Sequence, residues 1–350
     1  MTLPQCFALA FVLGCVAPAW AQLAPAPRTA EAAGTREGRI EIDAVVTDMA
    51  GKPVHGLELK DFTLLDDKHP AMILTVHSYD AIAARPAPPT EVIIVLDAVN
   101  FEARRLIFKR QEIERFLRQN GGHLAQPVSV FLLTGKGVNV QPRPYVDGNA
   151  LAGEIHKFEP GERMIGDSAG ATGAIERSQL SVQMFMGIVK SESKKPNRKL
   201  LIWVGPGWPL LSGVVFDTTA KARQQYFNSI VELSTMMREA RIALYSVSAE
   251  NGVNNYLYEV YLQGVKLERQ AEAAGLALKV IVVQSGGRIL GPNNDLAGQI
   301  TDCVGDANAF YTLSFDPQHA DRANEYHDLK VLVEQPGLSV RANTGYYNQP

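Results

Sequence analysis

The chain has 350 residues, of which 46% are hydrophobic, and it carries a formal net charge of -3. This length and composition allow a sizeable buried core and indicate one large domain with a smaller one. The nearly balanced charge excludes the basic surface that is typical of nucleic-acid-binding proteins.

The N-terminal segment, residues 1–21, has the pattern of a secretory signal peptide. Residues 7–16 carry no charge, and Ala19-Trp20-Ala21 provides the small residues expected before a cleavage site. The run is shorter than the roughly 20 residues that span a bilayer, which disfavours a membrane anchor. An alternative is the lipoprotein-like sequence Val12-Leu13-Gly14-Cys15, which would leave Cys15 acylated. We therefore expect export to the periplasm or the exterior, with membrane attachment only if Cys15 is lipidated.

Cleavage after Ala21 leaves one cysteine, Cys303. A single thiol forms neither an intrachain disulfide nor a zinc site. Cys303 shares the apolar face of a predicted helix with Leu296, Ile300 and Val304, so we expect its thiol to be a small buried hydrophobic group.

Residues 22–38 are rich in Ala and Pro without periodicity and are expected to form a linker. Residues 39–84 are predicted to be an N-terminal β segment, with apolar runs at residues 40–46, 62–65 and 72–76 separated by turns. Asp66-Asp67 closes the second run, and we interpret this pair as a solvated turn.

Residues 85–306 alternate buried strands with amphipathic helices, which predicts an α/β region with a parallel sheet flanked by helices. Strands are expected at residues 92–96, 128–134, 199–204, 242–247 and, as a short strand, 288–290. Helices are expected between them, including one that ends at residues 120–122, one over residues 178–190 after a loop at 162–172, and one over residues 280–283.

Residues 307–350 return to a β pattern, with runs at residues 310–315, 329–333 and 338–341. Neither end of the chain supplies enough strands for an independent sheet of good stability. We therefore predict that both ends build one small β-sandwich, with the α/β region inserted between them.

A set of motifs in a fixed order resembles the von Willebrand factor A-related proteins of the acidobacterial type. These motifs are residues 45–67, the strand that ends in Asp97, Pro196-Asn197-Arg198-Lys199, residues 242–249, Ser285-Gly286-Gly287-Arg288, residues 336–341 and Gly345-Tyr346-Tyr347. The resemblance covers about residues 40–347. It implies an exported protein with a von Willebrand A-like domain flanked by β segments.

The resemblance also implies where a metal site would lie. Domains of this kind bind Mg²⁺ with an Asp-x-Ser-x-Ser turn, a later Thr and a later Asp, since hard cations need oxygen ligands. This chain has Asp97-Ala98-Val99-Asn100-Phe101, so Val99 and Phe101 replace the serines. Ser168 or Thr172 could replace the Thr and Asn100 could assist, but residues 204–207 contain no aspartate. We expect no cofactor, with Asp97 a weak candidate Mg²⁺ ligand that instead caps the following helix.

Other chemistries find little support in the sequence. The seven histidines are scattered without the spacing of metal ligands, and we interpret them as surface or turn residues. The sequence has neither a P-loop nor a nucleophile elbow. Trp208 follows a strand on the same side of the sheet as Asp97. An exposed tryptophan there would anchor a partner, although packing of its own loop is the simpler interpretation.

We therefore predict a non-catalytic, exported binding or scaffold protein that recognises an unknown protein or cell-surface macromolecule and no nucleic acid. The candidate contact residues are Asp97, Asn100, Ser168, Thr172 and Trp208. One alternative is a Mg²⁺-dependent adhesion module, which a response to Mg²⁺ or Mn²⁺ would distinguish. Another is an extracytoplasmic hydrolase, for which the sequence offers no nucleophile–base pair.

Overall fold

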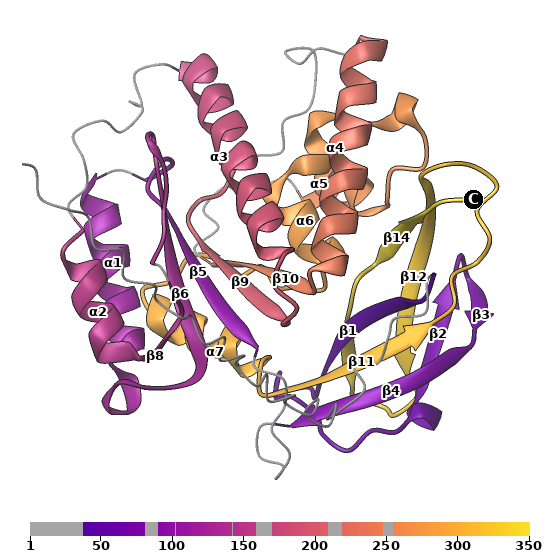
Figure 1. Cartoon of the computed structure of the whole chain (residues 1–350), viewed down its shortest axis with the longest axis horizontal. Coiled ribbons are helices and arrows are strands. Elements are labelled where there is room, and N and C mark those ends of the chain that lie inside the picture. The colour runs from indigo at the N-terminus through magenta and orange to yellow at the C-terminus, as the bar shows by residue number, and fades with distance from the viewer. Residues whose placement is uncertain are drawn as a thin grey trace, which may run out of the picture. The chain divides into compact units, whose positions relative to one another are not determined.

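The computed structural model describes residues 38–80, 90–101, 103–141, 143–158, 170–208, 219–247 and 255–350. They form a mixed α/β structure with a six-stranded sheet, helices on both of its faces, and two four-stranded antiparallel sheets (Figure 1). No helix in this part of the chain is long and apolar enough to cross a membrane. The predicted signal peptide, and its cleavage after Ala21, lie outside the described residues.

Four parallel strands form most of the large sheet. In spatial order they are β10 (Ile242–Val247), β9 (Lys199–Val204), β5 (Glu91–Asp97) and β6 (His123–Thr134). Two short antiparallel strands, β7 (Gly137–Asn139) and β8 (Tyr145–Asp147), pair with β6. Since β6 lies on one side of β5 and β9 on the other, the strand order reverses between β5 and β9. In open α/β sheets, ligands bind beyond the carboxyl ends of the strands at such a reversal.

Alternate residues of β5 face two separate hydrophobic cores. Val92, Ile94 and Leu96 pack with α1, α2 and α7, whereas Ile93 and Val95 pack with α3, α4 and α6. Burial of every residue of β5 is typical of a parallel strand that is covered on both faces. The helices are α1 (Ala103–Leu117), α2 (Gly148–His156), α3 (Gly170–Glu192), α4 (Ala220–Glu239), α5 (Asn255–Leu262), α6 (Leu278–Gln284) and α7 (Leu296–Gly305). Short 3-10 helices cover Leu59–Asp61, Gln119–Gly122, Glu268–Gln270 and Ala273–Leu276.

Both antiparallel sheets combine strands from the two ends of the described chain. Their orders are β13-β1-β11-β4 and β14-β12-β2-β3. The strands are β1 (Ile40–Thr47), β2 (Phe62–Asp66), β3 (His69–Ala71), β4 (Ile73–Asp80), β11 (Ala309–Phe315), β12 (Glu325–Val333), β13 (Ser339–Arg341) and β14 (Gly345–Asn348). One common core joins the two sheets and includes Ile42, Leu64, Leu313 and Val331. Strands from both chain ends thus pair with one another and share a core, which agrees with the prediction that the two ends build one β unit.

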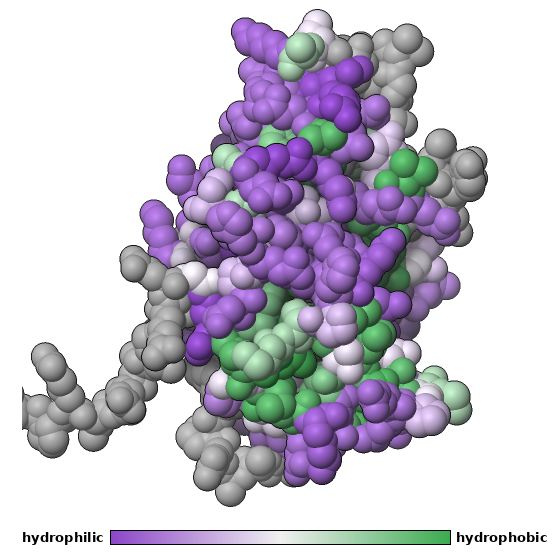
Figure 2. Space-filling model, turned by 90° about the vertical axis from the view of Figure 1, so that its right-hand side faces the viewer, coloured by the Kyte–Doolittle hydropathy of each residue, from purple (hydrophilic) through white to green (hydrophobic). Residues whose placement is uncertain are grey.

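The outer surface of these sheets is not uniformly polar. Figure 2 views the molecule from their side and shows a mainly hydrophilic surface with one area where hydrophobic residues gather. In strand β4, the side chains of Ile73, Leu74 and Val76 are half-buried. Met49, in the turn after β1, is 92% exposed, and Met72, between β3 and β4, is 75% exposed.

A group of charged side chains connects the antiparallel sheets to the parallel sheet. Arg241, between α4 and β10, donates hydrogen bonds of 2.6 and 3.1 Å to the carboxylate of Asp43 in β1. Arg198, which precedes β9, places Nε 3.4 Å from the same carboxylate. In β13, Arg341 donates a 2.8 Å hydrogen bond to the buried carboxylate of Asp306. Charge pairs with little exposure to water thus hold the two regions together.

Three details bear on the predicted helices and strands. Helix α3 begins at Gly170, so residues 170–172 belong to its first turn and not to a loop as predicted. Burial of Ser181, Phe185 and Val189 along one face stabilises this helix despite its glycines. Helix α6 confirms the helix predicted over residues 280–283. The strand predicted at residues 288–290 is only a single bridge between Ile289 and Ser246.

Candidate functional site

Asp97 ends β5 at the point where the strand order reverses, and its side chain is fully buried. Its Oδ1 accepts hydrogen bonds from the backbone N–H groups of Val99 at 3.1 Å and Asn100 at 3.2 Å. Its Oδ2 accepts from Asn100 Nδ2 at 2.7 Å and from Trp203 Nε1 at 3.2 Å. Asp97 therefore satisfies backbone N–H groups, as expected from the sequence. Those groups, however, lie in the turn before α1 and not in the helix.

Gly205 allows the chain after β9 to approach Asp97 closely. A Cβ atom at this position would lie 2.8 Å from Asp97 Cβ and 3.2 Å from Trp203 Nε1. These distances are shorter than ordinary van der Waals contact, so a larger residue would displace the carboxylate or the indole. The contact explains why glycine follows the strand here.

Asn100 connects Asp97 to α3. Its Nδ2 also donates to Ser181 Oγ at 2.8 Å, and Ser181 is fully buried. The sequence suggested Ser168 or Thr172 as the hydroxyl near Asp97, but the structure brings Ser181 there. Ser168 lies outside the described residues, and Thr172 is in the first turn of α3. The helical spacing that links Ser181 to Phe185 was the signal that could have identified it.

Around Asp97, the residues that the structure describes do not fit a Mg²⁺ ion. Val99 and Phe101, which replace two serines of the motif, are each 3% exposed and pack in the two cores of the sheet. Described groups of the protein donate four hydrogen bonds to Asp97, and these occupy the roughly four acceptor positions of a carboxylate. Among the described side chains, Asp97 belongs to no group of three potential metal ligands.

Burial raises the pKa of Asp97 to about 6, while hydrogen bonds from Asn100, Val99 and Trp203 oppose the increase.

Trp208 is not an exposed partner anchor, because its side chain is buried with 4% exposure. Its Nε1 donates a 2.6 Å hydrogen bond to the carbonyl oxygen of Leu276. Its ring packs against Trp203 and Phe185, with centroid distances of 5.0 and 5.8 Å. The alternative interpretation, packing of its own loop, is correct for this residue.

Trp208 also lines a groove of about 430 Å³ between α3 and α4. The apolar lining includes Val182 and Met186 of α3, Tyr226 and Met236 of α4, and Leu276. Polar side chains also line this groove, namely Ser178, Gln179, Gln183, Lys190 and Glu232. The volume lies within the range of ligand-binding clefts, and the lining is of the mainly apolar type that such clefts use.

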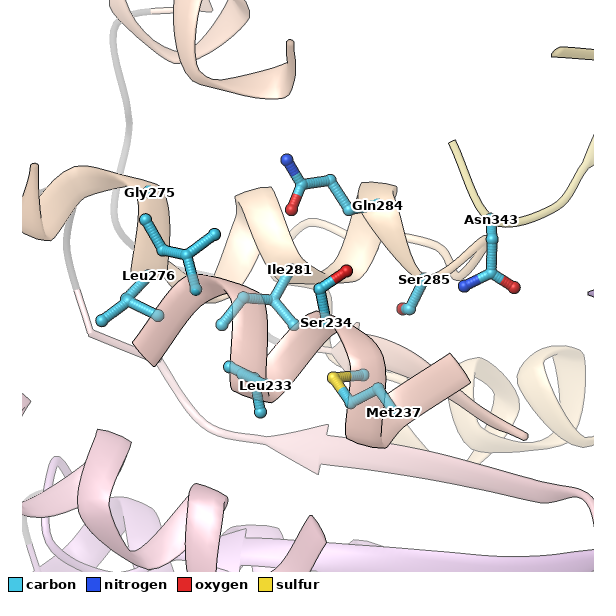
Figure 3. Close-up of a pocket in the computed structure, with 10 residues that line it drawn as sticks. Leu233, Ser234, Met237, Gly275, Leu276, Ile281, Gln284, Ser285 and Asn343 are labelled. Atoms are coloured by element: carbon cyan, nitrogen blue, oxygen red, sulfur yellow. The ribbon is translucent and has the colours of Figure 1, made fainter. Parts of the chain in front are cut away.

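A second hollow, between α4 and α6, is much smaller. Figure 3 shows Leu233, Met237, Ile281 and Ser285 around it. Its volume of about 20 Å³ is enough for one water molecule. This hollow is therefore too small for an organic ligand.

A third cluster, in the antiparallel sheets, contradicts two interpretations of the sequence. Asp66 is fully buried, so it is not part of a solvated turn. His327 is only 4% exposed, so it is not a surface histidine. The physical reason is strand periodicity. Phe62, Leu64 and Asp66 alternate on the inner face of β2, as His327, Leu329 and Val331 do in β12.

Comparison with known proteins identified no matching family model and no matching curated protein. Among solved structures, the chain is similar to the human COPII-coat protein Sec24c, with 8% identity, a TM-score of 0.33 and coverage of 78% of this chain and 46% of that chain. The pilus adhesin SpaC from Lactobacillus rhamnosus GG aligns with 8% identity and a TM-score of 0.36, over 81% of this chain and 47% of the adhesin. The SpRpn10 VWA domain aligns with 13% identity and a TM-score of 0.29, over 61% of this chain and 94% of that domain.

The chain thus spans about half the length of Sec24c and SpaC in these structures. The same holds for the proximal thread matrix protein 1 of the mussel byssus, of which 49% is covered at 15% identity and a TM-score of 0.31. All four scores are low, and these similarities carry no argument about the function of the chain.

Proposed function

We propose that this chain is an exported, non-catalytic protein with a von Willebrand A-like domain, which binds another protein at the groove between α3 and α4. The observation that carries the proposal is the mainly apolar groove itself, which Trp208 lines and which Trp203 links to the hydrogen-bonded carboxylate of Asp97. The hydrogen bonds that Asp97 accepts from Val99, Asn100 and Trp203 give this carboxylate a structural role, and the groove offers the binding surface.

The von Willebrand A-like assignment is supported by the order of motifs along the chain and by the position of Asp97. This residue ends the central strand of a parallel sheet, next to the reversal of strand order. Export is supported by the uncharged run at residues 7–16 and by Ala19-Trp20-Ala21.

A non-catalytic role is supported by the state of the reactive side chains. Cys303 is fully buried, and burial raises the pKa of its thiol to about 12, so little thiolate would form at neutral pH. The ammonium group of Lys199 donates hydrogen bonds to the carbonyl oxygens of Lys195, Asn197 and Ala240. Both groups are thus held in structural roles.

A protein partner is supported by the chemistry of the groove. Met186 and Met236 are flexible and polarizable, which suits a surface that adapts to apolar side chains of a partner. Gln183 and Glu232 add groups that can hydrogen-bond to a peptide backbone. The combination fits an extended or helical segment with several apolar residues.

Site-specific photo-crosslinking tests this proposal. We expect a photoreactive residue at Gln183, in the exported full-length protein, to give adducts in envelope extract that excess unlabelled protein suppresses. Met186→Glu should abolish these adducts, because it places a charge in the apolar groove. The matched control is a photoreactive residue at Val146, which is 65% exposed and lies on β8. Adducts that are equal at Val146 and Gln183, or that persist in Met186→Glu, would contradict the proposal.

A further inference from the structure

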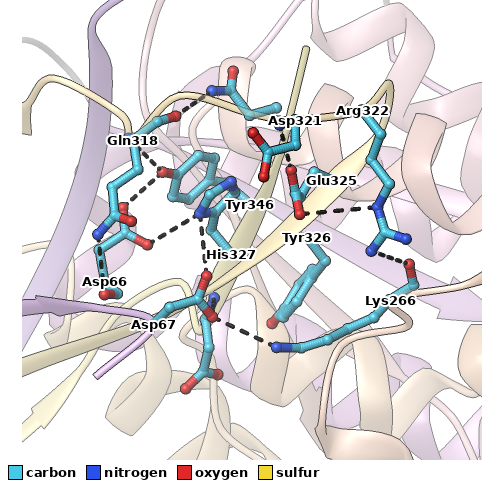
Figure 4. A network of polar contacts seen from close by, with 12 residues as sticks. Asp66, Asp67, Lys266, Gln318, Asp321, Arg322, Glu325, Tyr326, His327 and Tyr346 are labelled. Atoms are coloured by element: carbon cyan, nitrogen blue, oxygen red, sulfur yellow. Dashed lines mark hydrogen bonds and ion pairs between the residues drawn. The ribbon is translucent and has the colours of Figure 1, made fainter. Parts of the chain in front are cut away.

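Three potential metal ligands converge where the β2–β3 hairpin meets β12 (Figure 4). His327 Nδ1 lies 3.4 Å from Asp66 Oδ1 and 3.2 Å from Asp67 Oδ2. The ligand atoms of the three residues all lie within 4.8 Å of one another. Asp67 and Lys68 form the two-residue turn of the hairpin with φ values of 46° and 70°. This turn holds two consecutive carboxylates in front of one imidazole.

Buried atoms of two of these residues make no hydrogen bond. Asp66 Oδ1 and both ring nitrogens of His327, Nδ1 and Nε2, have no hydrogen-bond partner among the described residues, and the two side chains are 0% and 5% exposed. Asp66 Oδ2 does have a partner, since it accepts a 2.7 Å hydrogen bond from the hydroxyl of Tyr346. Because buried polar atoms nearly always have partners, Asp66 Oδ1 and His327 Nδ1 point to a ligand.

The separations between these groups match those of ligands around one metal ion. Two ligands of one Zn²⁺ ion, with bonds of about 2.0–2.2 Å at a tetrahedral angle, are separated by about 3.4 Å. The observed separations of 3.4 and 3.2 Å therefore agree with shared coordination.

We propose that Asp66, Asp67 and His327 bind one first-row divalent metal ion, with Zn²⁺ as the best fit. An imidazole nitrogen with two carboxylates suits Zn²⁺ and related ions, whereas Mg²⁺ prefers oxygen ligands in a near-octahedral array. The side chain of Asp67 is 33% exposed, so an ion can enter and water can complete the coordination. Tyr346 positions two of the ligands, since it hydrogen-bonds to Asp66 and stacks on His327 at a centroid distance of 4.9 Å.

A bound ion would tie the β2–β3 hairpin to β12 and so connect the two ends of the chain. This role is separate from the groove between α3 and α4, because the cluster belongs to the antiparallel sheets. Failure of one proposal therefore leaves the other unaffected.

The test is titration of the chelator-treated full-length protein with Co²⁺, followed by competition with Zn²⁺. We expect one Co²⁺ per chain with a visible ligand-field spectrum, and displacement by an equimolar amount of Zn²⁺. Asp67→Asn should raise the Co²⁺ dissociation constant at least about tenfold. This variant should keep the β2–β3 hairpin, since Asn also tolerates positive φ. His327→Gln should abolish the spectrum.

Two variants serve as matched controls. His55→Gln removes another histidine–aspartate pair, in which His55 Nδ1 lies 2.9 Å from Asp80 Oδ2, and Asp97→Asn changes the buried carboxylate of the parallel sheet. Both should bind Co²⁺ as the wild type does. No Co²⁺ or Zn²⁺ binding at millimolar concentration would overturn the proposal. So would binding that persists in Asp67→Asn and His327→Gln, or that is lost in Asp97→Asn.

Discussion

Two opposing effects act on the carboxyl group of Asp97. Complete burial disfavours the charged form and raises the pKa to about 6, and the four hydrogen bonds favour the charged form. The folded protein therefore binds this proton more tightly than the unfolded chain, whose aspartates have a pKa of 3.8. It follows that protonation of Asp97 stabilises the fold. This stabilisation is fully present when the pH is below the pKa of Asp97 in the unfolded chain. It is lost as the pH rises through the pKa of Asp97 in the folded protein.

Comparison of the wild type with Asp97→Asn isolates this contribution. As the pH rises from about 4 to about 7, we expect the difference in free energy of unfolding, wild type minus variant, to fall by about 2–3 kcal/mol. Urea unfolding of both proteins at a series of pH values measures this difference. If this difference in free energy did not change with pH, the hydrogen bonds to Asp97 would fully offset the effect of burial on its pKa.

At the scale of single residues, the sequence identifies Asp97 but not its surroundings. The replacement of the motif serines by Val99 and Phe101 can be seen directly in the sequence, and it explains why a metal site is not expected. Trp203 and Ser181 cannot be assigned in this way, because they reach Asp97 and Asn100 from other elements. The residue types of Asp66 and His327 favour a surface position, and only the place of these residues in alternating strands indicates that they are buried.

Among the helices and strands, fully apolar runs that precede a charged helix are predicted well. The buried run at residues 92–96 agrees with β5. The helix over residues 280–283 also agrees with the structure, although its β-branched residues favour a strand. Strands of three residues, such as β3, β7 and β8, carry too few side chains to show an alternation. Their positions depend on pairing with β2 and β6, which is a tertiary effect.

Asp43 of β1 is the shared counter-charge of Arg198 and Arg241, and its substitution tests how much this contact stabilises the fold. Asp43→Asn leaves Arg198 and Arg241 without their shared counter-charge, and the side chain of Arg198 is only 2% exposed. We expect the free energy of unfolding to fall by about 3 kcal/mol, as measured by urea unfolding, because a buried charge is left unpaired.

Asp316→Asn is the matched control for this substitution. Asp316 forms an ion pair with Arg39 at 3.6 Å, but its side chain is 68% exposed. Exposed pairs of this kind contribute little, so the expected loss is below about 0.5 kcal/mol. Equal losses in the two variants would mean that Asp43 does not hold the sheets together.

At the scale of the whole molecule, the two ends of the described chain depend on each other. Strand β11 lies between β1 and β4, and β12 lies between β14 and β2. Each antiparallel sheet thus has a strand from the C-terminal end at its centre. The sequence predicts that the two ends share one β unit, because neither end has enough strands to be stable alone. The order of strands within each sheet cannot be predicted in this way.

Deletion of residues 309–350 should therefore remove the support of β1, β2 and β4. We expect limited proteolysis of the shortened protein to cleave residues 38–80 as readily as an unfolded chain, because their central partner strands are absent. The core that α1, α2 and α7 form with the parallel sheet should stay protected, since none of its residues is deleted. Protection of α4 should be weaker, because its core loses Tyr326 and Tyr347. Deletion of residues 349–350 alone, which follow β14, is the control and should change little. If residues 38–80 remained protected after the longer deletion, the N-terminal strands would be stable on their own and the two ends would not form one cooperative unit.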